Sequence, residues 1–296
     1  MDLNSETASA QMAEYDAAEG RLRVILEECG PALVAYSGGV DSAYLAWMAY
    51  QVQGARMLAV IADSPSLPRR HLREALAFAA RHAIPCEVVT TSEMANPDYA
   101  RNDRNRCFFC KDALFARMEQ AAAERPGLGC LMYGVNADDT LDFRPGHRAA
   151  TEHGVRAPLL EAELGKSAVR SLAQRAGLEV WDRPASACLS SRVAYGLSVT
   201  PEVLARIEAG EEALYRLGFR QFRVRFHQDI VRLEIARDEL PQALTLEMAG
   251  ELTRCFKALG FQYVTLDLEG FRSGAMNEGL LPLHRLMAEE VPGRNG

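Results

Sequence analysis

The segment from Ser37 to Ser42 combines small, hydroxyl and acidic residues in an order suited to holding a polyphosphate. It reads Ser-Gly-Gly-Val-Asp-Ser, and its two glycines permit a tight turn in which no Cβ keeps a ligand from the main chain. Successive N–H groups in such a turn bind anions, and the start of a following helix adds partial positive charge. Asp41 suits a phosphate only if it holds Mg²⁺, which then bridges to the oxygens.

Three cysteines lie in two further segments, near one another or near polar and basic residues. Cys107 and Cys110 form a Cys-x-x-Cys at the start of an expected helix, and Cys188 precedes Ser191 and Arg192. Thiolates are both nucleophiles and metal ligands. The remaining cysteines share apolar surroundings and are interpreted as core thiols: Cys29, Cys86, Cys130 and Cys255.

Basic residues occupy every second position in the segment 222–227. Arg223, Arg225 and His227 alternate with apolar residues, which places the three basic side chains on one face of a strand. Such a row suits a phosphate or carboxylate, because arginine binds these groups with two hydrogen bonds. The alternative interpretation is a solvated face of a sheet.

Apolar runs that alternate with helical patterns must position these residues in the first two thirds of the chain. The expected strands are 31–36, 57–62, 86–90 and 128–133, with a short extended stretch at 179–181. The expected helices are 42–53, 67–82, 111–124 and 166–176. Continuous apolar strands between helices predict the α/β class, a doubly wound, mostly parallel sheet covered on both faces.

The last third of the chain has a different pattern, typical of a smaller α+β domain. A helix is expected at 201–217, a hairpin from 222–227 and 230–235, two helices at 240–248 and 251–259, and a strand at 263–268. These patterns predict two domains, residues 1–195 and residues 196–296.

The composition limits the class of protein. The 296 residues are 48% apolar and 25% charged, with 33 Lys and Arg against 40 Asp and Glu, a net charge of −7. These values exclude a disordered chain, a collagen and a disulfide miniprotein, and a general nucleic-acid binder would carry a broad positive field. No basic residue precedes Arg21, and the apolar stretch 32–50 is interrupted by polar residues. We therefore expect a cytoplasmic protein with reduced thiols and no membrane partner.

The segment 37–42 resembles the PP-loop of the ATP pyrophosphatase superfamily, whose members cleave ATP between the α and β phosphates and adenylate a substrate. It is not a Walker A motif, since the lysine of that motif is absent. The resemblance implies ATP contacts from the loop, from the end of the second strand, from the segment 134–139 and from a later lysine. The implied ATP-binding residues are Ala35, Ser37, Gly38, Gly39, Asp41, Ser42, Ala62, Gly134, Asn136 and Lys166, with Asp41 also binding Mg²⁺.

Over nearly its whole length the chain resembles the LarE family of ATP-dependent sulfur transferases. The matching stretches are the loop 37–42, 105–111, 134–139, 142–146, 184–192, 195–196, 222–227 and 265–271. The resemblance implies a substrate that is a nicotinate-derived mononucleotide with carboxylates, and a thiocarboxylated product that binds nickel in lactate racemase and related enzymes. ATP adenylates the carboxylate, and a sulfur nucleophile then displaces AMP.

The source of the sulfur divides this family. Members with only the cysteine matching Cys188 give up its sulfur and keep dehydroalanine, whereas members with three cysteines hold a [4Fe–4S] cluster. This chain has Cys107, Cys110 and Cys188, so the resemblance implies a cluster whose open iron carries an added sulfide. A redox dithiol, a structural zinc site and a sacrificial Cys188 remain open.

The resemblance also implies how the substrate is held. Arg223 and Arg225 bind the mononucleotide phosphate, and Ser191 and Arg192 position the substrate or its adenylate; His227 has no assigned role. A sulfide or sulfur donor and a homo-oligomer are further expectations. Three other functions remain as alternatives: a PP-loop enzyme that thiolates tRNA, an amidating PP-loop enzyme, and a non-enzymatic nucleotide-binding module. The net charge of −7 weighs against a nucleic-acid partner.

Overall fold

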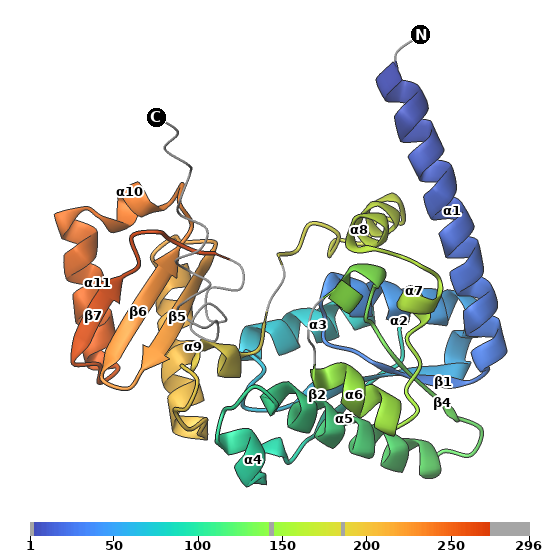
Figure 1. The fold of residues 1–296 in the computed structure, drawn as a ribbon, viewed down its shortest axis with the longest axis horizontal. Coiled ribbons are helices and arrows are strands. Elements are labelled where there is room, and N and C mark those ends of the chain that lie inside the picture. Colours follow the sequence, from blue (N-terminus) through green and yellow to red (C-terminus); the bar gives the residue numbers. More distant parts are fainter. Residues whose placement is uncertain (1–2, 142–144, 185–186, 273–296) are drawn as a thin grey trace, which may run out of the picture. The chain divides into compact units, whose positions relative to one another are not determined.

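The computed structural model of the protein describes residues 3–141, 145–184 and 187–272 (Figure 1). The chain divides into two compact units, Met1–Ala187 and Cys188–Gly296. This division assigns Cys188 to the second unit. Each unit has its own sheet and its own helices.

The sheet of the first unit has four parallel strands in the order β3-β2-β1-β4. The strands are β1 (Ala32–Ala35), β2 (Met57–Asp63), β3 (Cys86–Thr90) and β4 (Cys130–Tyr133). β1 is central, so that Ala32 lies opposite both Met57 and Cys130. The four apolar runs therefore form the parallel sheet that the sequence predicts.

Helices cover both faces of this sheet (Figure 1). On one face, Val34 packs in a core with side chains of α1 (Leu3–Cys29), α2 (Val40–Gln53), α3 (Arg69–Arg81) and α8 (Lys166–Arg175), such as Leu22 and Phe78. On the other face, Leu33 packs with side chains of α5 (Arg106–Ala123) and α6 (Pro145–Glu152), such as Phe115. The predicted α/β class, with helices flanking a parallel sheet, is confirmed.

The helices of the first unit vary widely in length. They are α1 (Leu3–Cys29), α2 (Val40–Gln53), α3 (Arg69–Arg81), α4 (Pro97–Ala100), α5 (Arg106–Ala123), α6 (Pro145–Glu152), α7 (Pro158–Glu161) and α8 (Lys166–Arg175), with 3₁₀ turns η1 (Gly54–Arg56), η2 (Glu93–Ala95) and η3 (Ala137–Leu141). Helix α1 was not predicted from the sequence. Its buried stripe is narrow, formed by residues four apart such as Ala18, Leu22 and Leu26.

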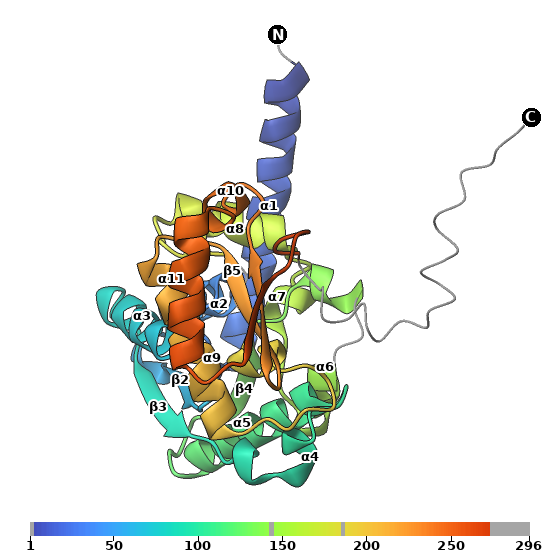
Figure 2. The same ribbon diagram turned by 90° about the vertical axis from the view of Figure 1, so that its left-hand side faces the viewer.

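The second unit has a mixed sheet of three strands in the order β5-β6-β7. Its elements are η4 (Leu189–Arg192), α9 (Pro201–Arg216), β5 (Phe222–His227), β6 (Ile230–Ile235), α10 (Leu240–Ala243), α11 (Leu246–Ala258) and β7 (Tyr263–Leu266). β5 and β6 form the predicted antiparallel hairpin, and β7 runs parallel to β6. Helices α9 and α11 lie along one face of this sheet, as Figures 1 and 2 show.

Two local predictions are wrong. The stretch 179–181 forms turns rather than an extended segment. The predicted helix 240–248 is broken at Leu244 and Thr245, because the Thr245 hydroxyl accepts a hydrogen bond from the Met248 N–H (3.2 Å) and caps the start of α11.

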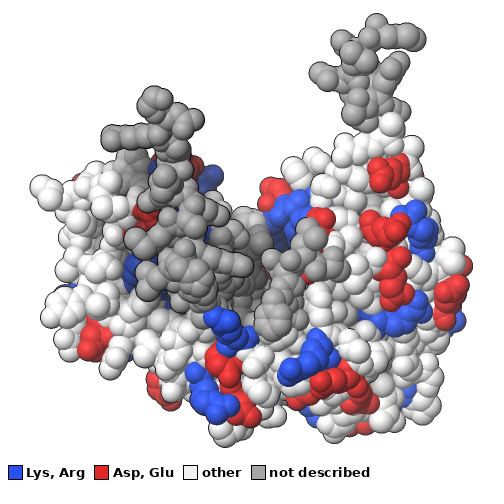
Figure 3. Space-filling model, in the orientation of Figure 1, with Lys and Arg blue, Asp and Glu red and all other residues white. Residues whose placement is uncertain are grey.

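On the face in Figure 3, the basic and acidic side chains of the described residues are interspersed. Among the described helices, none combines the length and the apolar character that crossing a membrane requires.

Candidate functional site

The loops that follow β1 and β4 meet at the carboxyl edge of the first sheet. β4 and β2 flank β1 on opposite sides, so the strand order reverses between β1 and β4. Open α/β sheets bind ligands at this point. A Cβ placed on Gly134 would lie only 2.8 Å from the Cα and N atoms of Ser42, so the loop after β4 touches the start of α2.

The glycine turn after β1 has a fixed conformation. Gly38 has a φ of +76°, and a Cβ there would lie 2.6 Å from the Ala75 Cβ. The Ser42 hydroxyl accepts a hydrogen bond from the Ser37 N–H (3.1 Å), and the two hydroxyl oxygens lie 3.0 Å apart. Gly39 is the N-cap of α2, and no described side chain caps the helix. The first N–H groups of α2 are therefore available to an anion.

Asp41, in the first turn of α2, is bonded through one oxygen only. Its Oδ2 forms an ion pair with the Lys166 ammonium at the start of α8. Its Oδ1 is buried and has no hydrogen-bond partner among the described residues. A buried carboxylate oxygen without a donor is costly unless a ligand binds it. The donor type fits Mg²⁺, which prefers carboxylate oxygens.

The loop after β4 is held by its own side chains. Asn136 is 2% exposed, and its amide oxygen accepts a hydrogen bond from the Asp138 N–H (3.0 Å). Asp138 in turn accepts a hydrogen bond from the Lys166 N–H (2.7 Å). The loop thereby joins the start of α8 to the start of α2, which places Gly134, Asn136, Asp41 and Lys166 in one contact network.

Arg183 is a residue of this site that the sequence analysis missed. Its Nη1 donates to the Gly38 carbonyl oxygen (2.9 Å), and its Nη2 lies 3.6 Å from a Glu74 carboxylate oxygen. Arg170 donates to the Arg183 carbonyl oxygen (2.7 Å) and fixes that segment. A lone arginine in an irregular segment carries no sequence signal, because only the tertiary fold brings its charge to the glycine turn.

The ends of β1 and β2 hold the other residues with implied contacts to ATP. Ala35 pairs with Val60 and Tyr133 on the neighbouring strands, and Ala62 pairs with Val89. After β2, Arg69 pairs with Asp63 and donates to the Ser64 carbonyl oxygen (2.6 Å), which holds the loop in place. Asp63 therefore has a structural role in shaping the loop.

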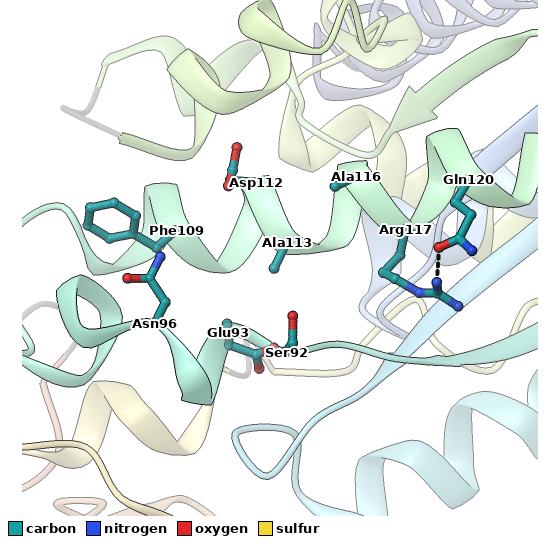
Figure 4. Close-up of a pocket in the computed structure, with 9 residues that line it drawn as sticks. All are labelled: Ser92, Glu93, Asn96, Phe109, Asp112, Ala113, Ala116, Arg117 and Gln120. Atoms are coloured by element: carbon teal, nitrogen blue, oxygen red, sulfur yellow. Dashed lines mark hydrogen bonds between the residues drawn. The ribbon is translucent and has the colours of Figure 1, made fainter.

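Cys107 and Cys110 lie in the first turn and a half of α5. Three residues apart, they share one side of the helix, where side chains are neighbours. Cys107 is exposed and Cys110 is half-buried. A pocket of about 290 Å³ lies along the same helix, and its lining includes α5 residues and the buried Glu93 on the facing segment (Figure 4).

Cys188 stands at the entry to the second unit's η4 turn. The hydroxyl of Ser191 and the Nη1 of Arg192 both donate to the Cys188 carbonyl oxygen, at 2.7 and 3.1 Å. Arg192 has a side chain only 1% exposed and pairs with Glu211 (2.8 Å). A buried ion pair of this kind adds little net stability, but it fixes the orientation of the two side chains. Glu211, which the sequence analysis missed, therefore fixes the segment that carries Cys188.

Arg225 belongs to a buried network on the polar face of the second sheet. Its side chain is 7% exposed, pairs with the fully buried Glu234 (2.8 Å) and donates to the Ser191 carbonyl oxygen (3.0 Å). Arg232 on β6 also pairs with Glu234 (3.0 Å). The polar row on β5 is thus largely buried, unlike a solvated sheet face.

The surroundings of Arg223 disfavour the charged form of its guanidinium. Burial, and then the nearby cations Arg192 and Arg225, lower the pKa of Arg223 to about 10, although Glu211 opposes this shift. Burial followed by Arg232 and Arg225 lowers the pKa of His227, whose Nε2 is buried without a described partner. An excess of buried positive charge favours an anionic ligand at this face.

Similarity to known proteins extends over most of the chain, although no family model matches it. An uncharacterized protein of Synechocystis sp. is 45% identical over 259 residues, which cover 88% of this chain and 96% of the relative. The pyridinium-3,5-bisthiocarboxylic acid mononucleotide synthase of Lactiplantibacillus plantarum is 34% identical over 270 residues, 91% of this chain and 97% of that enzyme. This chain belongs to the LarE family. An uncharacterized protein of Methanocaldococcus jannaschii is 26% identical over 241 residues.

Parts of two LarE-like motifs lie outside the described residues, namely 142–144 and 185–186. The described LarE-family residues fall into two sets. The first unit carries the glycine turn, Lys166 and the Cys107–Cys110 pair, and the second carries Cys188 and the arginine face. Among the described residues, no group of three or more His, Cys, Asp or Glu side chains forms a metal site.

Proposed function

We propose that the protein is an ATP-dependent sulfur transferase that replaces a carboxylate oxygen of a pyridinium dicarboxylate mononucleotide with sulfur, in the biosynthesis of a nickel-pincer nucleotide. The observation that carries this proposal is the 34% identity to the synthase of the bisthiocarboxylic acid mononucleotide over 91% of the chain. The geometry at the strand-order reversal supports it, because an uncapped helix start there meets a lysine and a carboxylate.

In the proposed first step, a substrate carboxylate oxygen attacks the α-phosphorus of ATP and pyrophosphate leaves. The turn at Gly38 and Gly39 and the first N–H groups of α2 bind the departing pyrophosphate. Mg²⁺ binds the Asp41 carboxylate, whose unpartnered Oδ1 supports this assignment. Lys166 then turns from Asp41 to the phosphate, and the adenine lies near Ala35 and Ala62.

The second unit holds the mononucleotide in this proposal. Arg223 and Arg225 bind its phosphate, and the buried positive charge around Arg223 supports this role. Ser191 and Arg192 position the acyl adenylate, since both already bond to the Cys188 carbonyl oxygen. A sulfur nucleophile attacks the acyl carbon, and AMP leaves because the phosphate oxygen is a good leaving group.

Cys107, Cys110 and Cys188 would hold a [4Fe–4S] cluster. The fit rests on thiolate chemistry and on two cysteines that are one helical turn apart, one of them exposed. When bound, the cluster would present a sulfide, taken from a sulfide or sulfur donor, without consuming a protein side chain.

Iron and sulfide counting on anaerobically purified protein tests this assignment. We expect about four irons per chain in the wild type and a severe loss in Cys107→Ala. Cys255→Ala, in the second unit, is the matched control and keeps its iron. Iron-free wild-type protein that loses H₂S from Cys188 after turnover would instead establish the sacrificial route.

A further inference from the structure

Two half-buried cysteines lie together at the amino edge of the first sheet, the edge opposite the glycine turn. Cys29 is the last residue of α1, and Cys130 is the first residue of β4. Gly30 turns the chain with a φ of +63°, and the Pro31 carbonyl oxygen accepts a hydrogen bond from the Cys130 N–H (3.4 Å). The two thiols are hydrogen-bonded to each other. Both cysteines pack against the core of the first unit, as predicted, and they also contact each other.

A fixed guanidinium faces this pair. Nη1 of Arg156 donates to the Cys29 sulfur at 3.2 Å. The Arg156 backbone is tied to β4, because its N–H donates to the Leu131 carbonyl oxygen (2.8 Å) and its own carbonyl oxygen accepts from the Tyr133 N–H (3.0 Å). Nη2 and Nε both bond to the Glu161 carboxylate. The charge beside Cys29 is thus held in place.

Because the Arg156 guanidinium donates to the Cys29 sulfur, it favours the thiolate form at Cys29. The hydrogen bond from Cys130, and then the charge of Arg156, lower the pKa of Cys29 to about 7, against the opposing effects of burial and Glu161. The hydrogen bond to Cys29 raises the pKa of Cys130. A cavity of about 470 Å³, lined by Cys130, Arg156 and six other residues, gives a small molecule room beside Cys130 and the guanidinium that contacts Cys29.

We propose that Cys29 and Cys130 form a redox-active dithiol that reduces a small hydroperoxide and closes to an intramolecular disulfide. The Cys29 thiolate attacks one peroxide oxygen, the O–O bond breaks, and the departing alkoxide or hydroxide takes a proton. The Cys130 sulfur then attacks the Cys29 sulfenic acid, and water leaves as the S–S bond forms. Two thiols supply the two electrons, so one hydroperoxide yields one alcohol or water and one further water. The site is independent of the sulfur-transfer reaction.

Peptide mass spectrometry after treatment with hydrogen peroxide tests the disulfide. We expect a cross-linked peptide that contains Cys29 and Cys130 and that dithiothreitol separates. In Cys130→Ser, Cys29 should stop at the sulfenic acid, which dimedone traps. The half-buried Cys86 is the internal control, because burial and then Glu87 raise its pKa to about 11. Oxidation of Cys29 no faster than Cys86, or oxidation of Cys29 without a link to Cys130, would overturn the proposal.

The alkylation rate of Cys29 as a function of pH tests the role of Arg156. We expect a midpoint near the pKa of about 7 in the wild type. In Arg156→Gln the rate at neutral pH should fall roughly ten-fold as the midpoint moves toward the ordinary thiol value of about 8.5. Arg156→Lys keeps the charge and should keep most of the rate, which separates charge from folding. A wild-type midpoint at the ordinary thiol value contradicts the proposal.

Discussion

The Lys166 ammonium, at the first residue of α8, forms an ion pair with the Asp41 carboxylate in the first turn of α2, 125 residues away in the sequence. The two side chains are 33% and 18% exposed. A carboxylate is favourable at a helix start, whereas a lysine there opposes the helix dipole. Lys166 therefore does not stabilise its own helix, whereas its ammonium is well placed to bind an anion at the carboxyl edge of the sheet.

Replacing Lys166 with alanine should reduce pyrophosphate release by about two to three orders of magnitude, because the lysine stabilises charge on the departing group. The measurement is pyrophosphate formed from Mg-ATP and the mononucleotide at saturating substrate. Lys257→Ala, a change of the same type in the second unit, should leave the rate unchanged. A Lys166→Ala enzyme within two-fold of the wild type, on the scale of about 0.4 kcal/mol, would exclude this role.

Gly134→Ala should destabilise the first unit by about 1–3 kcal/mol, because the new Cβ has no space against the backbone of Ser42. Urea unfolding measures the change. Gly129→Ala is the matched control, since a Cβ there meets nothing within 4 Å, and it should stay within about 0.5 kcal/mol of the wild type. Equal stability of the two variants would mean that the contact between the loop and α2 is not close.

Arg223→Met should stabilise the protein while weakening its hold on the mononucleotide. Burial and nearby cations lower the pKa of Arg223 to about 10 in the folded state, so its charge opposes folding at neutral pH. Removing the charge relieves a cost on the order of 1 kcal/mol or more. Thermal unfolding with and without the mononucleotide gives both quantities. Loss of stability in Arg223→Met would show that the arginine is structural.

His227 should make the protein less stable as the pH falls. Its pKa is lowered from 6.5 by burial and by nearby arginines, so the unfolded state binds a proton first as the pH falls. Its contribution is present above pH 6.5 and is lost on acidification through the folded-state pKa. His227→Gln should flatten the acid side of a plot of Tm against pH.

The contribution of His153 to stability should change with pH in the opposite direction, so this residue serves as the comparison. Its pKa is raised, because hydrogen bonds to Asp112 and Glu119 outweigh burial. Its contribution is therefore present below pH 6.5 and is lost as the pH rises through the folded-state pKa. If His153→Gln and His227→Gln changed the plot in the same direction, the environment assigned to one of them would be wrong.

The regular elements of the fold were predictable where one physical effect dominates. Runs such as 57–62 are apolar on both faces, so only a strand covered by helices on both sides can bury them. The alternation along β5 likewise placed Val224 in the core and Arg225 on the polar face. The helix α1 was missed because few of its described side chains are buried and polar side chains surround them.

The sequence predicts the motifs that carry the candidate functional residues, but not the contacts that position them. Glycines, hydroxyls and cysteines at fixed spacing are visible in the sequence, and so is Lys166 at a helix start. The partners that fix the geometry within each unit are not visible, because Arg183 in the first unit and Glu211 and Glu234 in the second act through tertiary contacts. A charged residue in a helix or strand looks the same in a sequence whether it is solvated or buried in an ion pair.

The most direct test of the proposed function is a stoichiometric assay of anaerobically purified protein with Mg-ATP, sulfide and the pyridinium dicarboxylate mononucleotide. Mass spectrometry follows the exchange of oxygen for sulfur in the mononucleotide, while pyrophosphate is counted in the same sample. We predict one pyrophosphate for each oxygen replaced, and none when the mononucleotide is omitted. Pyrophosphate released without the mononucleotide, or a mononucleotide that gains no sulfur, would contradict the account.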